Sequence, residues 1–412
     1  MLSYKLLDEA AKRFGESFYL LDREQIRRNY EKMINAFQKI YKDTQIAYSY
    51  KTNYIPQICK LINGLGGAAE VVSEMELWLA QSIGVKSNEI YYNGPYKKPE
   101  YMEKAMLSGV HVNLDAEYEI EIVHKIAEKY PEHLFEIGLR CNIDIGQEES
   151  SRFGFDVASG ELQKAMEDVG RIRNAKVTGL HCHIPFRTLE SYRKRVEKMD
   201  MILNMFPDQH FSYISMGGGY MGEIEDQMKS QFNFNPPSFE DYADVVAGFM
   251  RDRYQNQTDA PTLIIEPGSA LVANAMKYVT RVLNIKRARD LYIASLTGST
   301  FQMNPSVKNM NRPIEVYCAS GNTDRRESYR NLCMAGYTCI ESDYLYKGYD
   351  GRLGIGDYVV FGNVGSYSVV MKPPFILPDI PILEIQDDGE ITVWKEAQKV
   401  EEVFCGFTDG QP

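Results

Sequence analysis

The feature that most constrains the fold is a regular alternation of short apolar stretches and helical stretches between Gln45 and Gly268. Strand–helix alternation predicts a parallel sheet. Eight such units in about 230 residues favour a closed (β/α)8 TIM barrel over an open sheet. The predicted strands are Gln45–Tyr48, Ala68–Val72, Ile90–Tyr92, His111–Leu114, Phe135–Arg140, Lys176–His181, Tyr213–Met216 and Leu263–Ile265. The predicted helices between them include Ser73–Ser82, Pro99–Leu107, Glu117–Glu128, Leu189–Leu203 and Phe239–Arg253.

The pattern changes after Gly268, where strand-like segments follow one another with few long helices. We therefore predict an α/β chain with two domains. Residues 25–275 should form the barrel, and residues 276–412 should form an antiparallel β domain, a β-barrel or a sandwich. The predicted strands of this domain are Tyr278–Leu283, Leu291–Ser295, Ile314–Cys318, Asp357–Phe361 and Glu390–Trp394.

Four further segments carry local predictions. Leu6–Arg13 should be helical, Phe18–Leu21 should be a strand, and Arg23–Ile40 should form an amphipathic helix. The polar stretch Glu225–Pro237 is predicted to be a loop that could lie over the site.

Composition excludes several classes of function. The chain has 412 residues and a formal net charge of −11, which argues against nucleic acid as a partner. The first residues lack a signal-peptide pattern and no apolar run approaches membrane-spanning length, so we expect a cytoplasmic protein. Seven cysteines without paired spacing indicate reduced thiols, and no metal-binding motif is present.

Lys51 stands at the carboxyl end of the first predicted barrel strand, and a helix with Pro56 in its first turn follows it. Barrel enzymes carry their chemistry at this end of the strands. A surface lysine is the alternative interpretation, and other motifs along the chain decide between the two.

Those motifs occur in a characteristic order: Tyr48-Ser49-Tyr50-Lys51-Thr52-Asn53, Glu70-Val71-Val72-Ser73 with Glu76, His181-Cys182-His183-Ile184, Gly217-Gly218-Gly219, Glu266-Pro267-Gly268, Cys339 with Asp343, and Gly365-Ser366-Tyr367. In this order the chain resembles the fold-type III decarboxylases that use pyridoxal 5′-phosphate (PLP), of the diaminopimelate and ornithine decarboxylase branch, whose barrel is that of alanine racemase. The resemblance extends from about Phe18 to about Pro374, and it implies that residues 1–24 join residues 276–412 in the β domain. It implies PLP-dependent α-decarboxylation of an amino acid or an amino-acid-derived substrate.

The resemblance assigns roles to the barrel residues. Lys51 would form the internal Schiff base, because only a primary amine forms an imine that a substrate amine can exchange with. Glu266 would pair with the pyridinium nitrogen and strengthen the ring as an electron sink. Gly217, Gly218 and Gly219 would form the phosphate loop, since glycines let backbone N–H groups approach a phosphate.

Other residues are expected to surround the cofactor. His183 would stack on its ring, with His181 on the same side of the strand, and Gly268 and Tyr367 also match cofactor-binding positions of the family. Glu70 and Arg140 either contact the cofactor or form structural ion pairs inside the barrel mouth.

The resemblance also implies a homodimer with shared active sites. Cys339 of one subunit would protonate the carbanion formed in the other, and a thiol suits this role because it can give up a proton near neutral pH. Asp343 is expected to contact substrate in the same motif. The alternative is a racemase or a non-catalytic PLP-binding protein of this fold, but a racemase lacks the late cysteine motif.

Three positions depart from the family pattern. Pro185-Phe186 replaces Gly-Ser after the histidine motif, Ser269 replaces an arginine after Gly268, and Ile340 replaces the acid after Cys339. Without that acid a distal ammonium on the substrate would lack a partner. We therefore expect an altered amino-acid substrate that is free, conjugated or carrier-bound, with Arg187, Arg312 or a shifted Glu341 as alternative contacts.

Overall fold

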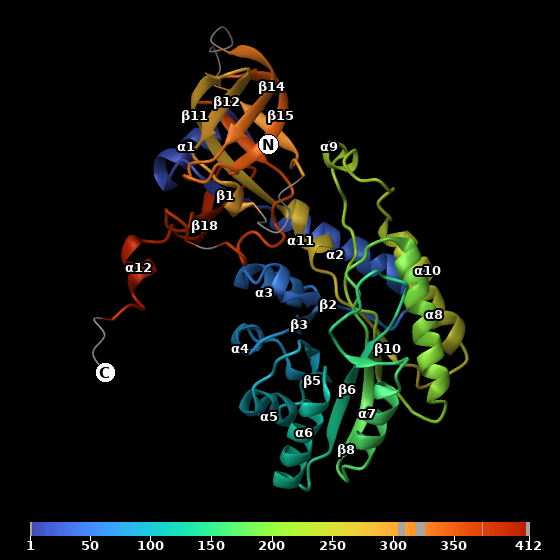
Figure 1. Ribbon diagram of the computed structural model, residues 1–412. Coiled ribbons are helices and arrows are strands. Elements are labelled where there is room, and N and C mark those ends of the chain that lie inside the picture. Colours follow the sequence, from blue (N-terminus) through green and yellow to red (C-terminus); the bar gives the residue numbers. More distant parts are fainter. Residues whose placement is uncertain (1, 304–309, 319–325, 373, 409–412) are drawn as a thin grey trace. The chain divides into compact units, whose positions relative to one another are not determined.

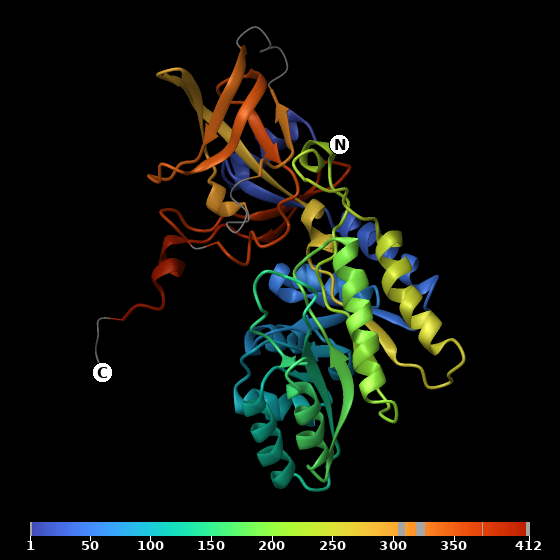
Figure 2. The same cartoon turned by 45° about the vertical axis from the view of Figure 1, so that its right-hand side comes forward.

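The computed structural model describes residues 2–303, 310–318, 326–372 and 374–408. They divide into two compact units. The barrel unit comprises Ile26–Gly222 and Pro236–Leu271, and the β unit comprises Met1–Gln25, Glu223–Asn235 and Val272–Pro412. Figures 1 and 2 show the elements of each unit.

The barrel unit contains a closed parallel sheet of eight strands, which confirms the predicted fold. Its order is β5-β4-β3-β2-β10-β9-β8-β6, and pairing of β5 with β6 closes the ring. Each predicted strand is present with ends shifted by no more than a few residues, and a short strand, β7, adds to β6. The strands are β2 (Thr44–Ser49), β3 (Ala68–Val71), β4 (Ile90–Tyr92), β5 (His111–Leu114), β6 (Phe135–Asn142), β7 (Phe155–Asp156), β8 (Ala175–His181), β9 (Tyr213–Ser215) and β10 (Thr262–Ile265).

Helices surround the strands of this unit, as Figure 1 shows. The predicted helices are confirmed, and α7 lies outside the helices that were predicted. Its first residue follows Gly160, whose φ of 86° is left-handed, so the usual polar N-cap signal is missing. The helices are α2 (Arg23–Gln38), α3 (Pro56–Gly64), α4 (Glu74–Ser82), α5 (Pro99–Leu107), α6 (Glu117–Lys129), α7 (Glu161–Gly170), α8 (Leu189–Met205) and α10 (Phe239–Tyr254).

Large and small side chains alternate inside the barrel. The ring of Tyr213 lies where a Cβ atom on Gly179 would be, and Asn113 Oδ1 together with the Tyr213 hydroxyl occupies the corresponding place at Gly138. The same hydroxyl donates a hydrogen bond to Asn113 at 2.7 Å. Glycine at two neighbouring strands therefore makes room for a buried tyrosine that would otherwise not fit.

The β unit is built on a mostly antiparallel sheet. Its main path runs β15-β14-β12-β11-β1-β17-β18, and β16 joins β11 to β13. The prediction was an antiparallel domain, and most pairings are antiparallel. Two pairings, β1 with β17 and β12 with β14, are parallel. The strands are β1 (Phe18–Leu21), β11 (Met276–Ala288), β12 (Leu291–Leu296), β13 (Ile314–Tyr317), β14 (Glu327–Ala335), β15 (Tyr344–Leu353), β16 (Tyr358–Phe361), β17 (Ile382–Ile385) and β18 (Ile391–Lys395).

The amino-terminal segment belongs to this sheet, as the resemblance implied. β1 pairs with β11, and α1 (Tyr4–Phe14) packs Leu7 and Ala10 against Phe18. The strands β14, β15 and β17 were not predicted. β14 and β15 pair through several register shifts and carry many polar residues, so they lack the regular alternation that identifies a strand.

The segment Glu225–Pro237, predicted to be a loop, contains one short helix, α9 (Asp226–Lys229), which was not predicted. Gln227 Oε1 accepts from Ile314 N at 3.0 Å, and Asn363 donates to the sulfur of Met228 at 3.1 Å. These contacts hold the segment within the β unit. The other short helices are α11 (Ser269–Val272) and α12 (Val400–Phe404). In the part of the chain that the structure describes, no helix is long and apolar enough to span a membrane.

Candidate active site

Lys51 lies at the carboxyl end of β2, in the single 3-10 turn Tyr50–Thr52 that follows the strand. Its Nζ donates to Ser49 Oγ at 2.7 Å and forms an ion pair with Glu70 at the end of β3. The lysine side chain is 33% exposed, whereas that of Glu70 is 1% exposed. A buried carboxylate therefore orients an amine that remains accessible.

An asparagine connects this pair to a second buried carboxylate. Asn93, directly after β4, donates to Glu70 and to Glu266, both at 3.1 Å. Asn113 in turn donates to Asn93 Oδ1 at 2.7 Å. With Lys51, these residues come from the carboxyl-terminal parts of five barrel strands, β2, β3, β4, β5 and β10. The closed sheet itself therefore sets the separation between the two acids.

Glu266 follows β10 and is held as an anion. Ser215 Oγ donates to one of its oxygens at 2.8 Å, and His181 Nε2 lies 3.2 Å from the other. Burial alone would raise the pKa of Glu266, but the charge and hydrogen bond of His181, together with the charge of Lys51, outweigh it and hold the pKa below its ordinary value.

The two histidines of the motif have different partners. His181 contacts Glu266, whereas His183 Nδ1 accepts a hydrogen bond from Gly218 N at 3.0 Å. Burial and the nearby Lys51 charge lower the pKa of His183 well below its ordinary value. His183 is therefore neutral, as its role as a hydrogen-bond acceptor requires.

The glycine loop follows β9, and its backbone requires glycine. Gly217 and Gly219 have φ angles of 66° and 94°, and a Cβ on Gly218 would lie 2.5 Å from Glu266 O. A Cβ on Gly268 would collide with Thr52 Oγ1. Within the described residues, no acceptor binds the N–H of Gly219 or of Gly268. The loop can therefore offer backbone donors to an anion.

Arg140 forms an ion pair inside the barrel mouth, which was one of the two roles expected for it. Its Nη1 lies 3.1 Å from Asp115 Oδ1. Glu119 accepts from Asp115 N at 2.6 Å and pairs with fully buried Lys97 at 2.9 Å. Burial lowers the pKa of Lys97, and the charge of Glu119 opposes that shift. This chain of charges fixes Asp115 and, through it, Arg140.

Sequence analysis missed several residues of this network. Asn93, Asn113, Asp115, Ser215 and Glu119 were not predicted, although the first four lie within or directly after barrel strands. The signal that could have found them is the position of a polar residue at the carboxyl end of a predicted strand.

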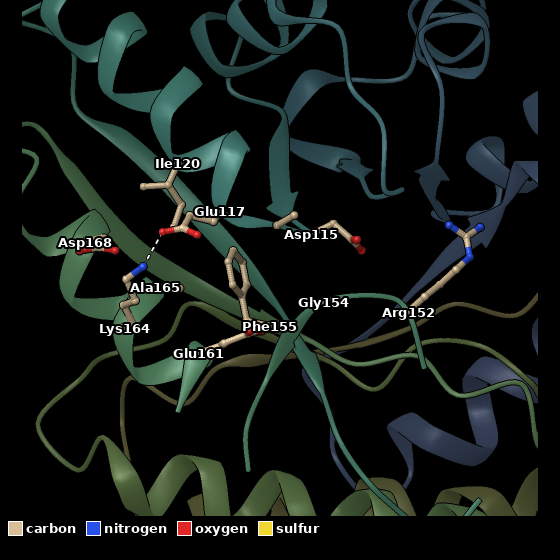
Figure 3. Close-up of a pocket in the computed structure, with 11 residues that line it drawn as sticks. Asp115, Glu117, Ile120, Arg152, Gly154, Phe155, Glu161, Lys164, Ala165 and Asp168 are labelled. Atoms are coloured by element: carbon tan, nitrogen blue, oxygen red, sulfur yellow. Dashed lines mark hydrogen bonds and ion pairs between the residues drawn. The ribbon is translucent and has the colours of Figure 1, made fainter. Parts of the chain in front are cut away.

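A pocket of about 320 Å³ lies beside Asp115, between α6, α7 and the segment that precedes β7. Figure 3 shows Glu117 and Lys164 paired on one side of Phe155 and Arg152 on the other. Neither Lys51, His183 nor Glu266 lines this pocket. It is therefore distinct from the surroundings of the Lys51 amine.

In the β unit, Asp343 organises the loop that carries Cys339. Its carboxylate accepts from Ser299 Oγ at 3.1 Å, Thr300 N at 2.8 Å and Thr338 Oγ1 at 2.7 Å. Asp343 is buried, whereas Cys339 is exposed. The aspartate thus fixes the loop and leaves the thiol accessible.

The other predicted residues differ in burial. Glu341 is exposed and Arg187 is half-buried. Arg312 is buried, with Nη1 3.9 Å from the sulfur of Met228, and burial lowers its pKa to about 10. Tyr367 has a φ of 57°, which is unusual for a residue with a side chain.

The comparison with known families decides the identity of this arrangement. The family described as "Pyridoxal-dependent decarboxylase, pyridoxal binding domain" matches residues 23–273, more than half of the chain. The chain belongs to this family. This pyridoxal-dependent decarboxylase uses PLP and acts on an amino acid.

Several relatives of this decarboxylase are known. A diaminopimelate decarboxylase of Methanocaldococcus jannaschii is 28% identical over 88% of this chain and 84% of its own length. A diaminopimelate decarboxylase of Aquifex aeolicus is 26% identical over 89% and 85%. The crystal structure of a diaminopimelate decarboxylase from M. jannaschii matches with a TM-score of 0.86 at 24% identity, over 98% of this chain and 94% of that one. This structural likeness confirms the fold.

The barrel residues of the decarboxylase fit PLP. An accessible amine lies beside a buried carboxylate, and a second carboxylate is kept ionised. Among the described residues, the N–H groups of Gly219 and Gly268 have no acceptor. These are the groups needed for an aldehyde, a protonated ring nitrogen and a phosphate.

Proposed function

We propose that the decarboxylase removes the α-carboxylate of its substrate at the carboxyl ends of the barrel strands, around Lys51. The observation that carries this proposal is the single network that joins Lys51, Glu70, Asn93 and Glu266. Bound PLP supplies a conjugated ring that takes up the electron pair released with carbon dioxide. The protein supplies the attachment, the charges and the proton.

Each barrel residue has a proposed role. Lys51 is the amine that attaches the cofactor, and Glu70 orients it. Glu266, kept anionic by His181, stabilises a proton on the ring nitrogen, and neutral His183 stacks on the ring. The backbone N–H groups of Gly219 and Gly268 receive the phosphate, in a turn shaped by Gly217 and Gly218, whose own N–H groups bond to Ser215 and His183. Arg140 supports the mouth of the site from β6.

The remaining proposed roles belong to the β unit. Cys339 delivers the proton to the substrate's α-carbon after carbon dioxide leaves, and its exposure supports this role. Tyr367 contacts the cofactor. Asp343 acts mainly by holding the Cys339 loop. All seven cysteines are free thiols, which supports a cytoplasmic location.

We further propose a homodimer in which Lys51 of one subunit works with Cys339 of the other. Mixing inactive Lys51→Ala and Cys339→Ala subunits should then restore activity, because each mixed dimer contains one intact site. Random exchange predicts recovery of about a quarter of wild-type activity. Activity after refolding or coexpression of the two variants is the measurement.

A matched control distinguishes active sites shared between subunits from stabilisation of one variant subunit by the other. A mixture of Lys51→Ala with Glu266→Gln should remain inactive, because both changes lie in the barrel and every site keeps one defect. Mixed dimers of the first pair that form and stay inactive would show that each site is built within one subunit.

The substrate is proposed to lack a free distal ammonium. The relatives from M. jannaschii and A. aeolicus are diaminopimelate decarboxylases. In this chain, however, Ile340 occupies the position after Cys339 where the family it resembles has an acid. Burying an unpaired ammonium costs about 3 kcal/mol, or roughly a hundredfold in specificity. An acidic, amide-linked or otherwise masked side chain fits better, with Arg187, Arg312 or Glu341 as contacts.

We expect diaminopimelate, lysine and ornithine to have kcat/KM values on the order of a hundredfold below that of a masked or acidic substrate. Steady-state carbon dioxide release across this panel is the measurement. The Ile340→Glu variant should improve turnover of the diamino substrates. Efficient turnover of diaminopimelate by the unchanged protein would refute the substrate assignment and leave the decarboxylase assignment intact.

A further inference from the structure

Arg195 of α8 is a fully buried cation that has no part in the network described above. Its side chain is 0% exposed. The guanidinium donates to the carbonyl oxygens of Gly218 at 2.8 Å, of Ile184 at 2.7 Å and of Phe186. Its Cζ lies 4.0 Å from the centre of the Tyr192 ring. All of these partners are uncharged.

No acidic side chain in the described ranges forms an ion pair with Arg195. A buried charge without a counter-charge is costly, and carbonyl dipoles offset only part of that cost. An anion close to the guanidinium would offset more of it. The carbonyl that receives its Nη1 hydrogen bond belongs to the glycine loop, so this unbalanced positive charge lies directly behind the loop.

The hydrogen bond to Gly218 O also orients the loop. In a trans peptide the carbonyl and the following N–H point in opposite directions. Fixing Gly218 O toward Arg195 therefore turns the Gly219 N–H away from it, and that N–H has no acceptor within the described residues. A carbonyl bonded to a cation also makes the N–H of the same peptide a stronger donor.

We propose that Arg195 is a positioning residue for the phosphate of the cofactor. It acts through the Gly218–Gly219 peptide and supplies the positive charge that makes the site prefer a phosphorylated cofactor. The inference rests on the proposed role of the glycine loop as the phosphate site.

The test compares binding of PLP with binding of pyridoxal, which has the same ring and aldehyde but no phosphate. Both are titrated into protein stripped of cofactor, with absorbance as the readout. Arg195→Gln removes the charge but keeps a donor, and should lower the preference for PLP over pyridoxal by about thirtyfold. Arg195→Lys keeps the charge and should stay within about fivefold of the wild type.

Tyr192→Phe is the matched control. It removes a neutral hydrogen bond of 2.9 Å to the same Gly218 carbonyl, so its preference for PLP should change by no more than about threefold. Equal weakening of PLP and pyridoxal in Arg195→Gln, or loss of the preference in a folded Arg195→Lys, would overturn the proposal.

A variant of the glycine loop tests the underlying assignment separately. Gly219→Ala should weaken PLP binding more than pyridoxal binding, because the residue needs a left-handed backbone. If Gly219→Ala leaves PLP binding unchanged, the phosphate-loop assignment fails. If Gly219→Ala weakens PLP binding but the Arg195 variants keep the wild-type preference for PLP, the loop assignment stands and the role of Arg195 is rejected.

Discussion

Replacing Lys51 with alanine is expected to abolish the visible absorption of the purified decarboxylase and to lower kcat on the order of ten-thousandfold. The reason is that the variant has no primary amine at the end of β2 to attach the cofactor. The absorption spectrum and the rate of carbon dioxide release are the two measurements. They separate loss of attachment from loss of a later step.

The matched control is Lys51→Arg. Arginine keeps a positive charge beside Glu70, so the ion pair and the local electrostatics are largely preserved. Because a guanidinium cannot take over the covalent role, this variant should be as inactive as Lys51→Ala. An unchanged spectrum in either variant would show that another lysine attaches the cofactor.

Glu266→Gln is expected to lower kcat by about a hundredfold or more, while the visible absorption band remains. Glutamine can keep the hydrogen bond from Ser215, but it removes the negative charge that stabilises a proton on the ring nitrogen. Ser215→Ala is the smaller change, and should lower kcat by only about tenfold. Equal rates for Glu266→Gln and the wild type would contradict the proposed ring contact.

The pH dependence of this site follows from the same charges. The folded pKa of Glu266 is depressed by His181 and Lys51 despite burial. The stabilisation from this carboxylate is therefore present above the pKa of an unfolded glutamate, about 4.3, and is lost as the pH falls through the lower folded value. Rate changes near neutral pH should consequently not come from Glu266.

Acid should also destabilise the protein through His183. Its folded pKa is lowered, so the native state disfavours the proton that the unfolded histidine takes up below about pH 6.5. Both groups therefore predict loss of stability on acidification.

The sequence by itself determined the barrel, because the alternation of strands and helices is a local property of the chain. The same periodicity located Lys51, Glu70 and Glu266 at strand ends, where a parallel barrel gathers its functional side chains. Local patterns failed where the backbone is irregular. The bulged strands β14 and β15 and the helix α9 within Glu225–Pro237 were missed for that reason.

Tertiary structure alone decided which partner each side chain has. Asn93 donates to both Glu70 and Glu266, and the second of these lies 173 residues away in the sequence. The motif could not show that His181 contacts Glu266 whereas His183 accepts from Gly218. Nor could it show that Arg195 is buried behind the glycine loop. Hydrogen bonds and buried charges depend on distances between strand ends that are set only when the sheet closes, and no local pattern of residues encodes those distances.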